Sequence, residues 1–346
     1  MKKTQFALAA LALVASTAAF ADGMTVYGAI DASLTKATGA STAMDGSGNW
    51  QGSIFGFKGS EDLDGGLKAT VDLEFGYNAS NGTMANGGTI PDQNAAAAAQ
   101  GIFNRLSNVG LAGDFGTVKL GQQLNTYIGA ALSGIVNANE SLYVPMLLVS
   151  GGKASVGNMF AGVAAGGTAG GFFTPNAVSY STPSMGGLSA TVMQQIQGAG
   201  TAADNARSAA VSYTVGDVKV TGGYLDRETV GKNMSLTANT VVANVNVGAT
   251  YITFDPTTGT KVSTYALHGS IPVADKLALS VNYVKNNETS AQTITNGGLQ
   301  YNLSKTTYLY GTISRATNGA FSLYSGGQSA VGTPNTGYAV GMVKNF

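Results

Sequence analysis

The chain ends on the stretch YAVGMVKNF (residues 338–346), in which Tyr338, Val340, Met342, Lys344 and Phe346 occupy alternate positions. Successive side chains of a β-strand point to opposite faces, so this spacing predicts a strand with one apolar face. A strand with one face for lipid and one for water is typical of a membrane β-barrel. The stretch therefore predicts a barrel strand that ends on a bare aromatic residue.

The same alternation recurs along the whole chain, while helical periodicity is absent over useful lengths. The apolar faces hold Val, Ala, Leu and Tyr, and the opposite faces hold mainly Asn, Ser, Thr and Lys. Clear examples are residues 24–34, 67–75, 241–251 and 277–283. Many strands of this kind fit a barrel with lipid outside and water inside.

The connections between these strands fall into two classes that alternate along the chain. Short turns are residues 60–66, 112–116, 183–187, 216–217, 272–276 and 304–305. Long loops rich in Gly, Ser and Asn are residues 38–49, 78–100, 198–207, 255–260 and 316–335. Alternating short and long connections are typical of bacterial outer-membrane barrels. We therefore predict an all-β fold, a 16-stranded antiparallel transmembrane β-barrel.

Two further expectations follow from a barrel in lipid. The sheet must close, because an unsatisfied backbone group in lipid is costly, so the first strand pairs with the last and brings Asp22 near Phe346. One long segment, residues 123–176, breaks the alternation and carries only two charges, Glu140 and Lys153. A loop of that length inside a hollow barrel is expected to fold inward and narrow the channel.

The N-terminal segment has the features of a secretory signal. A basic start precedes an apolar run (residues 6–14) and an A-x-A pattern at residues 19–21. The run is too short to span a bilayer as a helix. We therefore expect residues 1–21 to be a signal peptide and residues 22–346 to form the barrel.

Composition agrees with a membrane location and argues against other functions. Charged residues make up 10% of the chain, and Lys plus Arg (18) balance Asp plus Glu (18) without a basic cluster for nucleic acid. There is no cysteine, which removes thiolate nucleophiles and thiolate metal ligands. The single histidine, His268, makes neither a catalytic triad nor a metal site. We expect no enzyme activity, no cofactor and no metal.

Several motifs point to one family. Residues 26–31 read VYGAID, residues 55–69 read FGFKGSEDLDGGLKA, residues 103–105 read FNR, and residues 113–121 read GDFGTVKLG. Together they resemble the first five strands of the trimeric general porins of Gram-negative β-proteobacteria, and residues 176–188 resemble strands six and seven. The resemblance implies a homotrimer of 16-stranded barrels in the outer membrane, each with its own pore and an inward-folded third loop.

The chain departs from this family in the charges of its lumen. The family usually carries a ladder of arginines opposite the third loop. Ile54, Gln122 and Phe173 stand at or near positions where arginine is usual, whereas Arg105 is retained. Because three expected arginines are missing, we predict weak ion selectivity with a neutral or slightly cationic lean.

The predicted constriction of the pore involves six charged residues. They are Lys58, Arg105, Glu140, Lys119, Asp72 and Lys68. Alternation places the three lysines on the polar face, and Glu140 is the only carboxylate of the long segment. For Arg105 the two arguments differ: alternation puts it on the lipid side, the resemblance puts it in the lumen, and one β-bulge would invert the count. Trp50 fits either an interfacial aromatic girdle or simple packing.

The predicted function is an outer-membrane porin with a water-filled channel for passive diffusion of small hydrophilic solutes and ions. Selectivity would come from pore radius and fixed charge at the narrowest point. The alternative is a solute-specific channel of the same fold for aromatic or less polar molecules, suggested by Ile54, Phe172 and Phe173. An outer-membrane enzyme or adhesin is the third possibility, and His268, on the polar face, argues against a lipolytic barrel.

The expected partners follow from the location and the resemblance. They are two further copies of the chain, outer-membrane lipid and lipopolysaccharide, and the barrel assembly machinery, with no nucleic acid. In the resembling family a terminal aromatic residue is what the assembly machinery reads. Phe346 is therefore the expected assembly signal.

Overall fold

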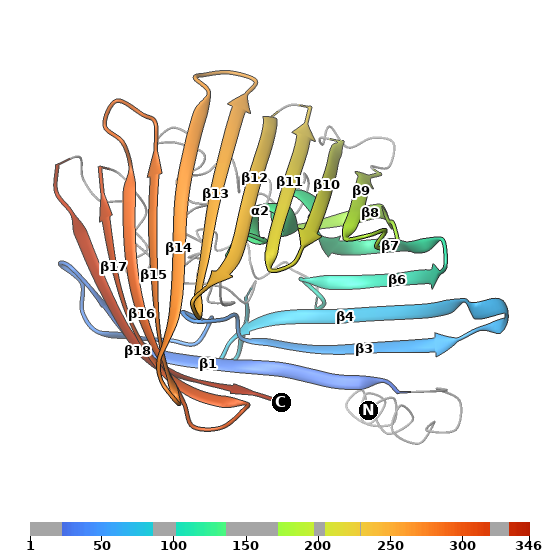
Figure 1. Ribbon diagram of the computed structural model, residues 1–346. Coiled ribbons are helices and arrows are strands. Elements are labelled where there is room, and N and C mark those ends of the chain that lie inside the picture. The colour runs from blue at the N-terminus through green and yellow to red at the C-terminus, as the bar shows by residue number, and fades with distance from the viewer. Residues whose placement is uncertain (1–22, 86–101, 136–171, 197–204, 229, 319–331) are drawn as a thin grey trace, which may run out of the picture.

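The computed structural model describes residues 23–85, 102–135, 172–196, 205–228, 230–318 and 332–346, and within these ranges the chain is almost entirely strand (Figure 1). The strands are β1 (Thr25–Ala37), β2 (Ala43–Asp45), β3 (Ile54–Asp62), β4 (Lys68–Asn78), β5 (Thr83–Ala85), β6 (Leu106–Gly113), β7 (Gly116–Leu124), β8 (Phe173–Ser181), β9 (Leu188–Gln195), β10 (Ala206–Val215), β11 (Val218–Arg227), β12 (Gly231–Val242), β13 (Val245–Pro256), β14 (Val262–Ala274), β15 (Leu277–Asn286), β16 (Thr293–Asn302), β17 (Thr307–Thr317) and β18 (Asn335–Asn345). A single 3₁₀ turn (Asp64–Gly66) joins β3 to β4.

Sixteen of these strands form a closed antiparallel ring. The ring runs β1, β3, β4, β6 and then β7 to β18 in order, and β18 pairs with β1. The three-residue strands β2 and β5 lie beside β1 and β4 without adding to the ring. The 16-stranded antiparallel barrel predicted from the alternation is confirmed.

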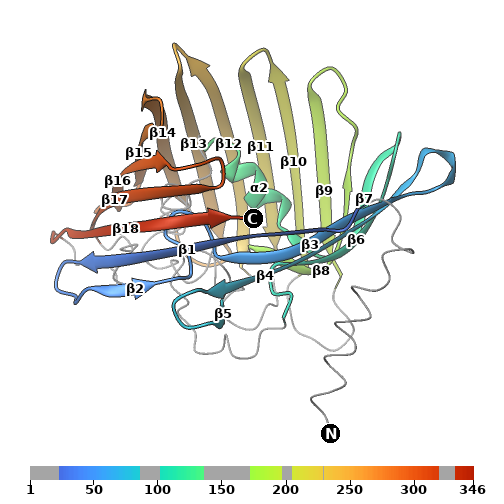
Figure 2. The same cartoon turned by 90° about the horizontal axis from the view of Figure 1, so that it is seen from below.

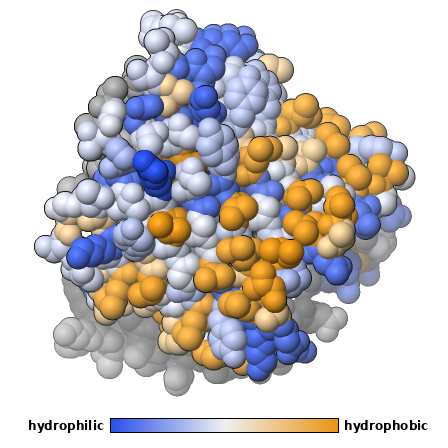
Figure 3. All heavy atoms as spheres, turned by 60° about the vertical axis from the view of Figure 1, so that its left-hand side comes forward, coloured by the Kyte–Doolittle hydropathy of each residue, from blue (hydrophilic) through white to orange (hydrophobic). Residues whose placement is uncertain are grey.

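The two faces of the wall differ as the alternation requires. On β1, Val26, Ile30 and Leu34 are exposed on the outer surface, while Ala29 and Asp31 between them are buried. The C-terminal strand behaves in the same way, with its large apolar side chains outside. Figure 3, which brings the β14–β18 side forward, shows apolar side chains gathered across this outer face. An apolar outer surface over polar inner faces suits lipid outside and water inside.

The barrel closes between its first and last strands, as predicted. The register of β1 against β18 runs from Ala29 opposite Asn345 to Ala37 opposite Gly337. Beyond it, the Gly28 N–H donates to the Phe346 carbonyl (3.0 Å) and the Phe346 N–H donates to the Gly28 carbonyl (3.1 Å). Phe346 thus makes both backbone hydrogen bonds of an antiparallel strand pair with Gly28. Asp22, expected near it, lies outside the described residues, as does the predicted signal peptide.

The ring of Phe346 lies on the outer surface over Gly28. A Cβ built on Gly28 would lie 2.5 Å from Cζ of that ring, well inside van der Waals contact. The ring also packs near Phe55, with their centroids 6.0 Å apart. Glycine at position 28 is therefore what allows the terminal aromatic ring to lie flat on the barrel wall.

The described part of the long segment lies inside the barrel. It forms α2 (Thr126–Leu132), which is capped by Asn125 and contacts strands β9 to β12. Figures 1 and 2 both place α2 within the ring, against the inner side of β10–β12. After the helix, the Ser133 hydroxyl lies 2.8 Å from the Thr237 hydroxyl on the inner face of β12. Glu140, predicted on this loop, lies outside the described residues.

The break in the alternation is shorter than the predicted residues 123–176. Strand β7 continues to Leu124 and β8 begins at Phe173. The register between these strands shifts between Gly121 and Gln123, and Asn176 on β8 adopts φ = 52°. A bulged strand no longer shows a period of two, which is why its first residues read as loop. Among the described residues, no helix is long and apolar enough to cross a membrane.

The Gly28–Phe346 contact makes a testable prediction. Gly28→Val should displace the terminal ring and lower the free energy of unfolding by about 1–3 kcal/mol, the usual cost of overpacking. The measurement is denaturant unfolding of the detergent-solubilised barrel, read by the gel mobility of unheated samples. Ala32→Val, on the same face of β1, is the matched control and should change little. Equal stability of the two variants would contradict a tight seat for Phe346.

Candidate functional site

Several charged side chains of the barrel interior gather on one part of its wall. They are Lys58 on β3, Asp72 and Glu74 on β4, Arg105 just before β6, and Lys119 on β7; we call this set the charged wall. The strand register puts Lys58 opposite Asp72, and Glu74 opposite Gly56, which is itself opposite Tyr27. Residues directly opposite one another share a face, so these side chains lie together on the inner surface.

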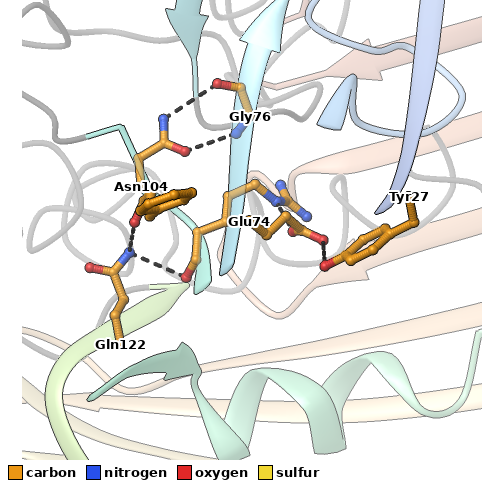
Figure 4. A network of polar contacts seen from close by, with 7 residues as sticks. Tyr27, Glu74, Gly76, Asn104 and Gln122 are labelled. Atoms are coloured by element: carbon orange, nitrogen blue, oxygen red, sulfur yellow. Dashed lines mark hydrogen bonds and ion pairs between the residues drawn. The ribbon is translucent and has the colours of Figure 1, made fainter. Parts of the chain in front are cut away.

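Arg105, Glu74 and Tyr27 form a hydrogen-bonded network (Figure 4). The Arg105 Nε donates to Oε1 of Glu74 at 2.5 Å, and the Tyr27 hydroxyl donates to Oε2 at 2.9 Å. The Arg105 and Glu74 side chains are only 14% and 9% exposed. Both carboxylate oxygens are therefore engaged, and the positive charge of Arg105 is neutralised at short range.

Arg105 faces inward because it is not yet part of a strand. Strand β6 begins at Leu106, and its outer face carries Val109 and Leu111. The backbone of Arg105 joins the ladder through its N–H, which donates to the Glu74 carbonyl at 3.1 Å. The alternation count assumed that the strand extended back to Arg105, which is why it pointed to the lipid side.

Two amide side chains hold the segment that carries Arg105. The Gln122 amide donates to the carbonyls of Phe103 (3.3 Å) and Arg105 (3.2 Å). The Asn104 Oδ1 accepts from the Gly76 N–H on β4 at 2.8 Å. Gln122, which stands where the resembling family usually has arginine, thus binds backbone carbonyls without adding a charge.

The other two altered positions are apolar contacts of the same region. The Arg105 guanidinium lies over the ring of Phe173, 4.7 Å from its centroid. Phe172 packs on Phe173 with centroids 5.3 Å apart. Ile54 lies opposite Ala29 and Gly76 on the inner face of the wall. Phe173 therefore packs against Arg105, the arginine that this chain retains from the pattern of the resembling family.

The lysines of the charged wall differ in their surroundings. The Lys119 Nζ lies 2.7 Å from Oδ2 of Asp72, so this pair is neutral at short range. Lys58 lies over the Tyr27 ring, 5.3 Å from its centroid, and among the described residues no carboxylate is within ion-pair distance of it. Lys68 lies apart, at the β3–β4 turn, in an exposed pair with Asp62.

The opposite wall of the barrel has a different character. Among the described residues, the inward-facing positions of β12 to β18 hold no Asp, Glu, Lys or Arg. Neutral polar side chains, His268, Asn282, Asn296 and Ser314, are buried there on neighbouring strands. Within the described ranges, the inner faces of β12 to β18 therefore carry no fixed charge, whereas those of β3, β4, β7 and β11 do.

Three residues were missed at the level of sequence. Glu74 and Tyr27 lie on the polar faces that alternation identified, but nothing in the alternation indicates that they bind Arg105. Arg227, at the end of β11, is fully buried. Its positive charge lies close enough to the Tyr127 hydroxyl in α2 to influence the pKa of that group. Burial raises the pKa of the Tyr127 phenol, which keeps it neutral, while the nearby Arg227 opposes this shift.

Comparison with known proteins gives consistent results. The family model described as Gram-negative porin matches residues 7–320. Outer membrane porin protein 32 of Delftia acidovorans is 28% identical over 379 aligned residues, which cover all of both chains. The solved anion-selective porin from Comamonas acidovorans has a TM-score of 0.76 at 24% identity, over 94% of this chain and 99% of that one. A trimer form of OmpT from Vibrio cholerae has a TM-score of 0.64 at 14% identity, over 94% and 99%.

Two ion pairs, the part-buried Arg105–Glu74 pair and the exposed Lys68–Asp62 pair, allow a matched test of stability. Glu74→Ala should lower the free energy of unfolding by about 3–5 kcal/mol, because it removes the carboxylate that neutralises the largely buried Arg105. Asp62→Ala breaks the exposed pair with Lys68 and should cost only about 0–1 kcal/mol. Denaturant unfolding in detergent measures both. A Glu74→Ala barrel as stable as Asp62→Ala would show that Arg105 does not depend on Glu74.

Proposed function

The chain belongs to the Gram-negative porin family and is an outer-membrane channel, and we propose that small hydrophilic solutes and ions diffuse passively through its lumen with little preference for either sign of charge. The comparisons support the channel. The weak selectivity is our inference from the residues of the interior.

One observation carries this proposal: four of the five charges of the charged wall are already paired, and only Lys58 is not. Arg105 is bound to Glu74 and Lys119 to Asp72, at 2.5 and 2.7 Å. Two unit charges 4 Å apart interact by about 4 kcal/mol at an effective dielectric near 20, so such pairs strongly reduce the field that a passing ion meets. The described inner faces of β12 to β18 carry no charged side chain, so they add no further fixed charge to the lumen.

Among the described residues of the charged wall, Lys58 is the cation without an ion-pair partner, and its charge limits how far selectivity can shift toward cations. The Comamonas relative is described as anion-selective. In this chain, Ile54, Gln122 and Phe173 contribute no positive charge to the lumen. We therefore propose a neutral or slightly cationic lean, with Glu140 as a further acidic group on the third loop.

The solute-specific alternative rests on the apolar residues near the constriction. Phe172 and Phe173 could offer a stacking surface to an aromatic solute. The Arg105 guanidinium already lies over the Phe173 ring, which leaves less of that surface for a ligand. General diffusion therefore remains our proposal.

We further propose that the channel assembles as a homotrimer. A trimeric form is known for the Vibrio neighbour. The outer surface of β3 and β4 carries a cluster of aromatic rings, Phe55, Phe57 and Phe75, with centroid distances of 5.3 and 5.5 Å. Flat aromatic surface of this kind suits a protein interface better than a mobile lipid chain. Lipid and lipopolysaccharide would then surround the rest of the barrel.

The selectivity proposal is tested by reversal potential across a planar bilayer under a salt gradient. The wild-type channel should give a reversal potential near zero. Lys58→Gln should shift it toward cation preference, because the one unpaired cation of the described wall is lost. Lys68→Gln, at the exposed turn, is the control and should leave it unchanged. A strongly anion-selective wild-type channel would overturn the proposal.

We also propose that residues 1–21 are removed on export and that Phe346 is read by the barrel assembly machinery. Deletion of Phe346 should lower the yield of folded trimer in the outer membrane, measured from unheated samples on gels. The same deletion should change refolding in detergent less, because no machinery takes part there. Unaltered assembly in cells would remove this role from Phe346.

A further inference from the structure

The strand that lies between β1 and β4 is interrupted. Both β2 and β3 pair with β1, β2 opposite residues 33–35 and β3 opposite residues 25–29. Residues 30–32 of β1 thus lie opposite the segment that joins β2 to β3, residues 46–53. Eight residues stand where three would continue the strand, so five extra residues must leave the plane of the wall. We call residues 46–53 the inner segment.

The inner segment turns into the barrel. Trp50 is 3% exposed and packs against Tyr310 and Tyr308 of β17, with ring centroids 5.1 and 6.4 Å apart. These two tyrosines alternate with the exposed Leu309, so their rings are on the inner face. Ala339 and Val343 of β18 complete the cluster. Trp50 therefore packs in the barrel interior. Of the two alternatives for this residue, packing is confirmed and a place in an interfacial aromatic girdle is wrong.

The carboxylate of Asp31 fixes the middle of the inner segment to the wall. Asp31 of β1 is fully buried and accepts hydrogen bonds from the backbone N–H of Trp50 (2.6 Å) and of Gln51 (3.0 Å). It also accepts from the Tyr310 hydroxyl at 2.7 Å. A Cβ on Gly341 would lie 2.6 Å from that hydroxyl, so glycine there leaves room for Tyr310 to reach Asp31.

Further contacts brace both ends of the inner segment. Asp45 accepts from the Ser47 N–H and hydroxyl at 2.8 and 2.7 Å, and Ala79 donates its N–H to the Gly46 carbonyl at 2.7 Å. Gln51 donates to Oδ1 of Asn345 at 2.7 Å and accepts from the Tyr308 hydroxyl. The segment is thus held by β1, β17, β18 and the turn after β4, which makes it a fixed part of the interior.

Side chains repair the wall where the strand has left it. The Ser53 hydroxyl accepts from the Asp31 N–H (3.0 Å) and donates to the Asp31 carbonyl (3.1 Å). The Tyr77 hydroxyl donates to the carbonyl of Ala29 at 3.3 Å. These groups replace ladder partners that a continuous strand would have supplied. The interruption is therefore satisfied internally, as a wall in lipid requires.

We propose that the inner segment is a second constriction element, which narrows the channel from the side opposite α2 and helps to set the size of solute that passes. The inner segment lies against β17, β18 and β1, whereas α2 lies against β9 to β12, half-way round the ring of sixteen strands. Figure 2 shows α2 beside β10 to β12, in agreement with these contacts. The proposal rests on the channel function but not on the proposed lack of ion selectivity.

The test is a variant in which residues 46–53 are replaced by three strand-forming residues, Thr-Val-Thr, so that β2 and β3 become one strand. Single-channel conductance should rise about 1.5-fold, because a fixed obstruction has left the water column. Larger neutral sugars should also permeate in liposome swelling. Shortening the exposed β13–β14 turn (residues 257–261) is the matched control, since it removes residues without touching the interior.

Asp31→Asn supplies an independent variant with the full-length chain. Its amide keeps the size of the side chain but places an N–H₂ group against donors, so the inner segment should loosen and conductance should rise and fluctuate. Heat-modifiable migration on gels shows which variants are folded. A folded shortened barrel with wild-type conductance and wild-type sugar exclusion would overturn the proposal. If the shortened chain does not fold, an unchanged conductance of folded Asp31→Asn would overturn it equally.

Discussion

Every backbone N–H and C=O group at membrane depth must find a partner within the protein, and this requirement shapes the whole chain. It explains why sixteen strands close into a ring and why the last residue still forms a rung with Gly28. It also explains why side chains far apart in sequence form hydrogen bonds with backbone groups of the wall. Ser53 and Tyr77 complete the edge of β1 where its neighbour turns inward, and Asn104 does the same for Gly76 on β4. Loops can therefore leave the wall only where such a replacement is available.

The interior follows a second rule, because charges removed from bulk water need partners. Glu74 binds both Arg105 and Tyr27, and Asp72 binds Lys119. A lumen lined in this way contains several ionisable groups, yet we expect it to present a weak net field. The number of charged residues in a pore is thus a poor guide to its selectivity, and the pairing between them is the relevant quantity.

Much of the fold could be predicted from the sequence because a period of two repeats in almost every strand. Strand number, closure and the identity of the outward residues depend only on that period. The failures occur where the period is broken. Arg105 precedes its strand, Asn176 belongs to a bulge, and Trp50 lies in an insertion. At each of these places the orientation of a side chain is decided by contacts across the barrel, which local alternation does not contain. The same reason hid Glu74 as the partner of Arg105.

Our proposals assign the control of solute size and of ion selectivity to different parts of this channel. The charged wall lies on β3, β4 and β7 and at Arg105, whereas the inner segment is held mainly by neutral groups and by two carboxylates, Asp45 before its first residue and the buried Asp31. A carboxylate suits the position of Asp31 for a geometric reason. Three donors converge on Asp31, and a carboxylate offers about four acceptor positions without adding a donor of its own. An amide of the same shape offers fewer acceptor positions and brings an N–H₂ group. The negative charge of Asp31 is therefore best understood as the means of holding the inner segment in place, and not as a binding group for ions in transit.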